Sequence, residues 1–394
     1  MTAVANPAAG GSFAVYVMNG AGGKLSNPAT VTVDNPLPTL TALSKTSVVA
    51  PGAAFTLTVT GTKFVTTSKI VWKGTALATT FVSTTALTAA IPAADLGSAG
   101  TVAVTVENPA PAGGVTLAKT FTIDNPPPTL TALSKTSVVA PGAAFTLTVT
   151  GTKFVTTSKI VWKGVALATK FISGTSLSAA IPATDLASAG TVAVTVDNPA
   201  PAGGVTLAKT FTIENPAPTL TALSKTSVVA PGAAFTLTVT GTNFVSTSKI
   251  VWKGNALATT FVSRTALTAA IPATDLASAG TVAVTVDNPA PGGGVAVAKT
   301  FTIDNPAPVL KTISPTTGKQ GGAAFTLTVT GTGFVAASKV SWNGVALATT
   351  YAGAAKLTAA VPAADLAKAG TALVTVASPA PGGGTSAAMK FTVP

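Results

Sequence analysis

The sequence predicts an all-β protein, built as a tandem array of antiparallel β-sandwiches with about seven strands each. The first observation behind this prediction is a segment, AAFTLTVTGT, that recurs at a constant ninety-residue spacing, at 53–62, 143–152, 233–242 and 323–332. The second is that Phe55, Leu57 and Val59 alternate with threonines within it. This period of two is typical of a strand with one buried face, and threonine and valine suit a half-buried pleated surface.

The repeats also predict the domain organisation. The unit has ordinary domain size and enough apolar residues for its own core. Four complete modules are expected, at 35–124, 125–214, 215–304 and 305–394. The last module diverges from the other three, as terminal repeats often do when one of their faces has no neighbour.

Residues 1–34 align with the end of a module only. The segment 11–19 aligns with 100–108, and 27–34 aligns with the strand that ends at Asp124. About the last third of a module is therefore expected here, with an unpaired sheet edge. Two interpretations stay open: the chain begins within a repeat, or another subunit supplies the missing strands by complementation.

Within the module 35–124, short apolar runs alternate with turn signals. The Ala50-Pro51-Gly52 and 108–114 segments are turns, and 93–100 is a helix-like patch too short to be stable alone. Strands are expected at 38–44, 54–60, 68–73, 77–81, 86–91, 101–106 and 115–123. Seven short strands with Gly/Pro turns at this spacing favour an antiparallel sandwich.

One tryptophan recurs in the third strand of every module. An exposed tryptophan could stack on a sugar ring, but Ile70 shares the Trp72 side of the strand and is apolar. In the last module Val71 is replaced by Ser341, whereas the Trp side keeps Val340. The tryptophans are therefore assigned to the core with Phe55, Leu57 and Val59; they are Trp72, Trp162, Trp252 and Trp342.

Two lysines flank the outward face of the same strand. They are weak candidates for an anion-binding surface, and the alternative is a solvated edge that prevents aggregation between strands. The fourth module has Asn343 at the second position, which favours the solvated edge. The pairs are Lys69 and Lys73, Lys159 and Lys163, and Lys249 and Lys253.

Composition argues against catalysis and metal binding. The chain has no Cys and no His, which excludes disulfides, thiolate metal sites and Cys or His catalysis. Each junction carries a single carboxylate, too few for calcium, and no motif pairs two carboxylates for glycoside hydrolysis. We expect no enzyme activity, no cofactor and no metal. The junction carboxylates are Asp34, Asp124, Glu214 and Asp304.

The net charge of +12 is spread almost evenly over the modules, and Arg264 is the only arginine. Specific nucleic-acid binding is therefore not expected, whereas weak attraction to anionic polysaccharide or a cell surface is. No apolar run is long enough for a transmembrane helix. The N-terminal segment MTAVANPAAGG lacks the basic and apolar regions of a secretion signal.

Five short motifs carry a family resemblance. They are PTL at 38–40, GTKF at 61–64, VWKG at 71–74, IP at 91–92 and NPAPAGG at 108–114. Together they resemble the IPT/TIG family of immunoglobulin-like domains, and are most similar to the tandem copies of large bacterial exported or surface proteins. The resemblance covers the chain apart from its partial start and implies immunoglobulin-like sandwiches that serve in stalks, adhesin segments or accessory modules.

The junctions between modules are short and rich in proline: DNPLPTL, DNPPPTL, ENPAPTL and DNPAPVL. Proline stiffens the chain, so we expect a semi-rigid, extended rod of on the order of 130–160 Å. The favoured function is a structural extracellular stalk or filament protein of a bacterial surface, associating with neighbouring copies in a fibre. A cell-surface adhesin or carbohydrate-binding array, and an accessory segment of a larger exported enzyme, are the alternatives.

Overall fold

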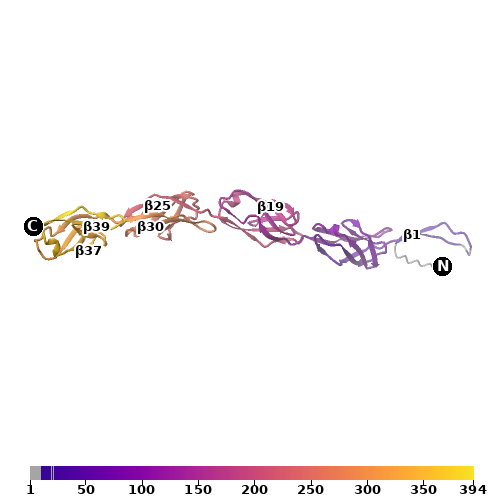
Figure 1. The fold of residues 1–394 in the computed structure, drawn as a ribbon. Helices are drawn as coiled ribbons and strands as arrows, with labels where there is room; N and C mark the ends of the chain where they lie inside the picture. The colour runs from indigo at the N-terminus through magenta and orange to yellow at the C-terminus, as the bar shows by residue number, and fades with distance from the viewer. Residues whose placement is uncertain (1–9, 19, 21) are drawn as a thin grey trace. The chain divides into compact units, whose positions relative to one another are not determined.

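The structure, a computed structural model, describes residues 10–18, 20 and 22–394 (Figure 1). Within these ranges the regular elements are β-strands and four short 3-10 helices, as the sequence predicted for an all-β chain. Asn19, which aligns with Asn108, and residues 1–9 lie outside the described residues. By its contacts the chain divides into two compact units: 1–136 with 143–185 and 191–211, and 137–142 with 186–190 and 212–394.

The module 35–124 consists of two facing sheets. One sheet has the strand order β3-β5-β9-β8, and the other has the order β4-β12-β10-β6-β7, with β11 also paired to β10. Its elements are β3 (Thr39–Leu43), β4 (Ser47–Val49), β5 (Phe55–Thr62), β6 (Lys69–Trp72), β7 (Thr75–Ala76), β8 (Thr79–Ser83), β9 (Ala86–Ile91), η1 (Ala93–Leu96), β10 (Gly100–Asn108), β11 (Gly114–Val115) and β12 (Lys119–Asp124).

The next two modules repeat these strand orders. The elements of 125–214 are β13 (Thr129–Leu133), β14 (Ser137–Val139), β15 (Phe145–Thr152), β16 (Lys159–Trp162), β17 (Val165–Ala166), β18 (Thr169–Ser173), β19 (Ser176–Ile181), η2 (Ala183–Leu186), β20 (Gly190–Asn198), β21 (Gly204–Val205) and β22 (Lys209–Glu214). Those of 215–304 are β23 (Thr219–Leu223), β24 (Ser227–Val229), β25 (Phe235–Thr242), β26 (Lys249–Trp252), β27 (Asn255–Ala256), β28 (Thr259–Ser263), β29 (Ala266–Ile271), η3 (Ala273–Leu276), β30 (Gly280–Asn288), β31 (Gly294–Val295) and β32 (Lys299–Asp304).

The last module differs at the strand equivalent to β4. A single parallel bridge, Thr317 to Thr392, stands where the other modules have a three-residue strand. Its elements are β33 (Val309–Ser314), β34 (Phe325–Thr332), β35 (Lys339–Trp342), β36 (Val345–Ala346), β37 (Ala348–Gly353), β38 (Lys356–Val361), η4 (Ala363–Leu366), β39 (Gly370–Ser378), β40 (Gly384–Thr385) and β41 (Met389–Val393).

The repeated AAFTLTVTGT segment forms one of the two inner strands of the first sheet. In the first module β5 pairs antiparallel with β9 from Phe55–Ile91 to Thr60–Ala86. Leu57 and Val59 are fully buried, and they join residues of both sheets in one cluster. Phe55, at the beginning of the strand, is only half-buried; its ring stacks on Phe121 with 5.7 Å between centroids. The alternation therefore places two side chains inside the core and one at its margin.

The expected elements differ from the observed ones in four places. The strand β4 was not expected, because Ser47–Val49 has no alternation. The two-residue strand β7 (Thr75–Ala76) was not expected either. The helix-like patch is one 3-10 turn of four residues. The expected strand 115–123 is divided into β11 and β12. Together with β4 and β7, this gives a complete module more strands than the seven predicted.

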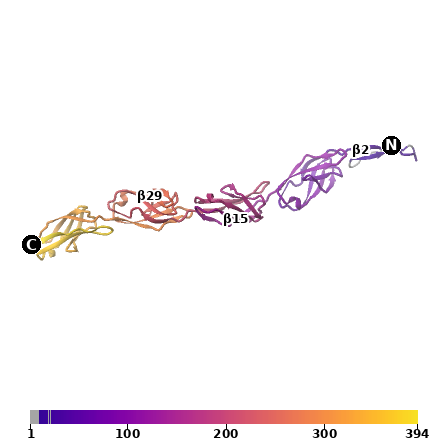
Figure 2. The same cartoon turned by 90° about the horizontal axis from the view of Figure 1, so that it is seen from above.

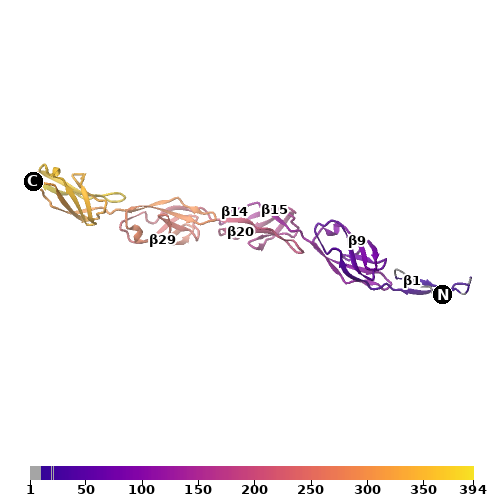
Figure 3. The same cartoon turned by 90° about the horizontal axis from the view of Figure 1, so that it is seen from below.

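Ahead of the first module lies a hairpin of two strands, β1 (Gly11–Val15) and β2 (Ala29–Val33). They form a separate two-stranded sheet. In the part of the chain that the structure describes, no second sheet faces this ribbon (Figures 2 and 3, the views from above and below). The hairpin corresponds in sequence to β10 and β12 of a complete module.

Candidate functional site

The four repeated tryptophans lie inside the sandwiches. In the first module Trp72 is 1% exposed, and its ring contacts Phe121 with 5.0 Å between centroids. The equivalent aromatic pairs recur in the other modules at 4.8–5.0 Å. These side chains are therefore placed to fill the core and not to stack on a ligand in solvent. Among the residues that the structure describes, the buried indole nitrogens of Trp72, Trp162 and Trp252 find no hydrogen-bond partner.

The lysine pairs do not share one strand face, contrary to the sequence-based interpretation. Lys69 begins β6 and lies opposite Glu107 of β10. Lys73 has left the strand: with φ of 50° it occupies the tight turn before β7, next to Gly74 at 79°. Its ammonium group donates a hydrogen bond to the backbone oxygen of Asp95 at 3.0 Å. The alternation that predicted a shared face ended one residue earlier than expected.

The same arrangement holds for the other lysine pairs. Lys163 and Lys253 also have φ of 50°, and each ammonium group donates to the backbone oxygen of the equivalent aspartate, at 3.1 and 3.0 Å. Lys159 and Lys249 begin their strands opposite Asp197 and Asp287. All six lysines are exposed.

A buried polar cluster, which sequence reasoning missed, lies at the beginning of each module. Asn108 is 1% exposed at the end of β10. Its side-chain nitrogen donates to the backbone oxygens of Pro36 and Lys63, both at 2.8 Å, and its oxygen accepts from the Ser68 hydroxyl. Ser68 also accepts from the Val65 amide at 2.8 Å. One side chain thus joins three chain segments.

The first residue of the module, Asn35, is held by the loop that follows β10. Its backbone amide donates to the backbone oxygen of Pro111, and its backbone oxygen accepts from the backbone amide of Gly113, both at 2.8 Å. Its side chain donates to the oxygen of Pro109 at 2.7 Å. Gly113 has φ of 73°, and a Cβ there would lie 2.2 Å from the backbone oxygen of Asn108, so only glycine fits. We call Asn35, Ser68, Asn108 and the loop 109–113 the asparagine clamp.

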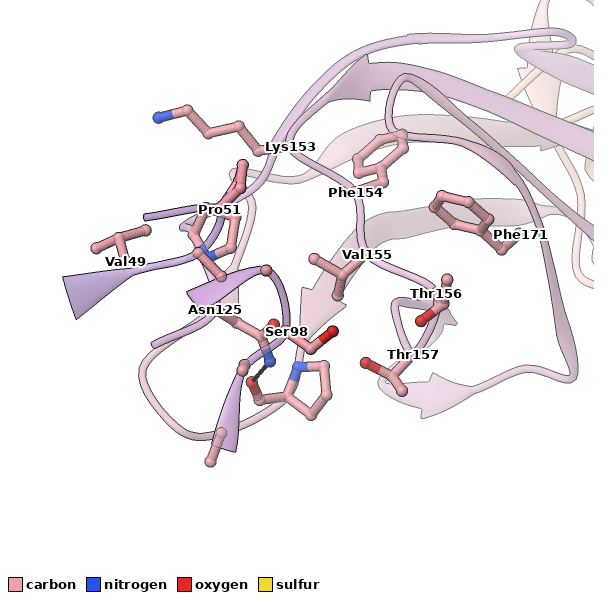
Figure 4. Close-up of a pocket in the computed structure, with 16 residues that line it drawn as sticks. Val49, Pro51, Ser98, Asn125, Lys153, Phe154, Val155, Thr156, Thr157 and Phe171 are labelled. Carbon is pink, nitrogen blue, oxygen red and sulfur yellow. Dashed lines mark hydrogen bonds between the residues drawn. The ribbon is translucent and has the colours of Figure 1, made fainter. Parts of the chain in front are cut away.

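The asparagine clamp recurs in the other modules. Asn125 donates through its side chain to Pro199, an interaction drawn in Figure 4, and Asn215 and Asn305 do the same with Pro289 and Pro379. Asn198 and Asn288 take the place of Asn108. In the last module the buried pair is Ser338 and Ser378, whose hydroxyls are 2.9 Å apart.

The end of each of the first three modules is held by the strand β4 or its equivalent. In the first module β4 runs parallel to β12, with Thr122, Ile123 and Asp124 opposite Ser47, Val48 and Val49. The amide of Ala50 donates to the oxygen of Asp124 at 2.9 Å. The very next residue, Asn125, already donates through its amide to Pro201 of the following module, at 2.8 Å.

Two further junctions have the same arrangement. The backbone oxygen of Glu214 accepts from the Ala140 amide at 2.8 Å, and the backbone amide of Asn215 donates to the oxygen of Pro291 at 2.7 Å. Asp304 accepts from the Ala230 amide at 2.8 Å, while Asn305 donates to Pro381 at 2.7 Å. Consecutive residues are therefore hydrogen-bonded into different modules, and no free linker residue lies between them.

A pocket of about 770 Å³ lies next to the first junction (Figure 4). Phe154 and Phe171 line one side of it, and the other lining residues include Ser98, Thr156, Thr157 and the cationic Lys153. Its sixteen lining residues include no carboxylate. Such a surface can accept a ligand by stacking and hydrogen bonding, but its lining holds no pair of groups for acid–base catalysis.

Equivalent residues line pockets of about 480 and 660 Å³ further along the chain. Their aromatic residues are Phe244 with Phe261, and Phe334 with Tyr351. None of the lysines proposed for an anion surface lines any of these three pockets.

Across 10–18, 20 and 22–394, acidic side chains do not gather in groups of three that could hold a metal ion. None of the helices in that part of the chain is long and apolar enough to cross a membrane.

The chain matches the family model described as IPT/TIG domain at residues 38–123, 218–303 and 308–393. The module 125–214 lies outside the matched ranges, although it has the same strand orders as 35–124. A comparison with curated proteins finds no match.

Among solved structures, the chain is similar to an ICAM-5 D1–D4 ectodomain fragment, with 14% identity, 90% of this chain and 99% of that chain covered, and a TM-score of 0.34. For a Ca²⁺-stabilised adhesin that helps an Antarctic bacterium bind ice, the identity is 16%, 91% of this chain and 98% of that chain are covered, and the TM-score is 0.21. For the plexin A4 extracellular region, the identity is 13%, 84% of this chain is covered, and the TM-score is 0.22; this chain spans only 35% of that region. These TM-scores are too low to support an argument about function.

Proposed function

This chain belongs to the IPT/TIG domain family, and from that premise we propose that it is a structural protein: an extracellular stalk or filament subunit of a bacterial surface, without enzyme activity. IPT/TIG domains are typically non-catalytic. In this proposal the useful properties are length and stiffness, and both come from the repetition of one module.

The observation that carries the proposal is that no unpaired linker residue separates consecutive modules at the three junctions described above. Asp124 is hydrogen-bonded into one sandwich and Asn125 into the next, so few backbone torsions are free to change between them. The prolines after each junction asparagine restrict the chain further. An array joined in this way is expected to be a semi-rigid rod whose length is set by the number of modules.

Tension along such an array would act on β4 and β12. The chain enters the module at the asparagine clamp and leaves it at the end of β12. Because β4 and β12 are parallel, pulling the two ends apart displaces these strands along each other. Several hydrogen bonds must then break together, which resists extension better than breaking them one at a time.

Electron microscopy of the purified chain tests the proposal. We expect elongated particles of on the order of 130–160 Å. As a matched control, four Gly/Ser residues are inserted after Asp124, Glu214 and Asp304, which should leave each sandwich folded and give visibly bent particles. Compact globular particles of the unaltered chain would contradict the proposal. Sedimentation of the same samples tests whether copies associate in a fibre, as we also propose.

A binding array or adhesin is the second candidate, favoured by the recurring pockets with aromatic and hydroxyl side chains. A neutral sugar is the ligand whose chemistry fits Phe171, Thr156 and Thr157. Glycan-array binding that is lost on replacing Phe171, Phe261 and Tyr351 by Ala would support it. Ile172, exposed and adjacent to Phe171 on β18, is the control position. Binding that survives the three replacements, or no binding, removes this candidate.

A further inference from the structure

The β1–β2 hairpin has the same register as β10 and β12 of a complete module. Gly11 lies opposite Val33 and Phe13 lies opposite Val31. In the complete module Gly100 lies opposite Ile123, and Val102 lies opposite Phe121. Aligned residues therefore occupy the same positions along both strand pairs. The hairpin has the backbone arrangement of one third of a sandwich.

The side chains of the hairpin that correspond to core residues are exposed. Phe13, Val15 and Val17 are 44%, 47% and 69% exposed, whereas the equivalent Val102, Val104 and Val106 are at most 2% exposed. Val31 is 48% exposed, whereas the equivalent Phe121 is fully buried. On the opposite face, the hairpin and the complete module have the same exposure. Ala14 and Thr30 of the hairpin are exposed, and so are the equivalent Ala103 and Thr120.

The complete module shows what covers this face and both edges. Phe121 is covered by Trp72 from β6 and by Phe55 from β5. The edge of β10 pairs with β6, and the edge of β12 pairs with β4. All these partners come from residues 35–99, ahead of β10 in the chain. Within residues 10–18, 20 and 22–394, β1 and β2 pair only with each other.

We propose that the β1–β2 hairpin is a docking surface for the first two-thirds of a repeat of this chain's own type, a polypeptide with the strand pattern of residues 35–99. On binding, this partner adds strands to both edges of the hairpin and packs its second sheet over Phe13, Val15, Val17 and Val31. The product is a fifth sandwich. Two edges and one face must match at once, so an unrelated apolar peptide does not suffice.

The experiment mixes the full chain with a polypeptide of residues 35–99, kept unfolded in urea until dilution. We expect a one-to-one complex by native mass spectrometry. Trp72 is the only tryptophan of the added polypeptide, so its fluorescence emission should shift to shorter wavelength as it becomes buried. Amide hydrogen exchange of residues 11–33 should slow by about tenfold or more. Their sequence is unique in the chain, so this region can be followed separately.

Two cross-strand pairs provide matched variants. Phe13→Lys with Val31→Lys charges the apolar face and should abolish the complex. Ala14→Lys with Thr30→Lys places the same charges on the outward face, where the complex should persist. Because the first pair could also disturb the hairpin, a third variant leaves the full chain intact: Trp72→Asp in the added polypeptide should also prevent binding.

Three results would overturn the proposal. They are no slowing of exchange in residues 11–33, a complex that forms equally well with both lysine pairs, and association of the full chain with itself through this hairpin. The last result would make a second hairpin the occupant of the apolar face.

Discussion

The Ser68 hydroxyl donates a hydrogen bond to the side-chain oxygen of Asn108, forty residues further along the chain, and both residues are at most 2% exposed. Through the Asn108 amide group the contact extends to the backbone of Pro36 and Lys63. This cluster fixes the beginning of the module against the end of β10. It is the structural basis of the first prediction.

Replacing the buried asparagine by alanine should destabilise each module by roughly 2–3 kcal/mol, because three partner groups are left without it inside the sandwich. For a domain of this size the midpoint of thermal unfolding should fall by on the order of 10 °C. The variant carries Asn108→Ala, Asn198→Ala and Asn288→Ala, and unfolding is followed by calorimetry. The last module, with its Ser338–Ser378 pair, should keep its own transition.

Asn255→Ala is the control for this variant. That asparagine is exposed, and its one hydrogen bond, to the Lys253 oxygen, is 3.4 Å long. The control should unfold within about half a kcal/mol of the unaltered chain. An equal loss of stability in both variants would contradict a structural role for the buried asparagines.

The sequence predicted the β5 strand well, because alternation of Leu57 and Val59 with threonine is a local property of the chain. The asparagine clamp could not be predicted in the same way. The Asn-Pro pair at 108–109 is a strong turn signal, and its burial depends on Ser68 and Pro36, which are distant in the sequence. The only available signal was recurrence: an asparagine stands at this position in three of the four modules.

Two errors in the expected elements also have a physical cause. The strand β4 was missed because its three residues gain their order from pairing with β12 and not from their own pattern. Lys73 was assigned to a strand face because a period of two does not mark where a strand ends. Gly74 was the signal for the turn that places Lys73 at positive φ.

Two substitutions of the core tryptophan should differ sharply in cost. Trp72→Ala leaves a large cavity and should cost roughly 3–5 kcal/mol. Trp72→Phe keeps most of the ring and removes an indole N–H that has no acceptor, so the relief of the unpaired donor offsets part of the lost packing. We expect a cost below about 2 kcal/mol.

The measurement is urea unfolding of chains changed at Trp72, Trp162 and Trp252 together. Circular dichroism follows all modules, and the fluorescence of Trp342 reports the unaltered last module. If phenylalanine were as destabilising as alanine, the indole N–H would have to make a contact that stabilises the native state.

The exposed lysines should act through net charge and not as a site. Changing the six lysines to glutamine lowers the net charge from +12 to +6 and should weaken retention on a heparin column. A control with six other exposed lysines changed has the same net charge: Lys119, Lys209, Lys299, Lys311, Lys356 and Lys390. We expect both variants to elute at the same, lower salt concentration. A selective loss in the first variant would instead establish an anion-binding surface.

The mechanical role proposed for β4 and β12 depends on the hydrogen bond from Ala50 to Asp124. Ala50→Pro removes this donor, and Ala140→Pro and Ala230→Pro remove the equivalent donors to Glu214 and Asp304. The last module holds its final strand differently, through the Gly318 amide and Thr392. It is therefore an unaltered reference within the same molecule.

Single-molecule pulling from the two ends should give unfolding events that each lengthen the chain by on the order of 280 Å, as expected for a module of this size. In the proline variant three of the four unfolding events should occur at lower force. The unfolding force of the last module should be unchanged. Hydrogen bonds that must shear together lose resistance when one is removed, whereas a module that yields elsewhere is not affected. Unchanged forces in all four events would therefore show that β4 and β12 do not bear the load.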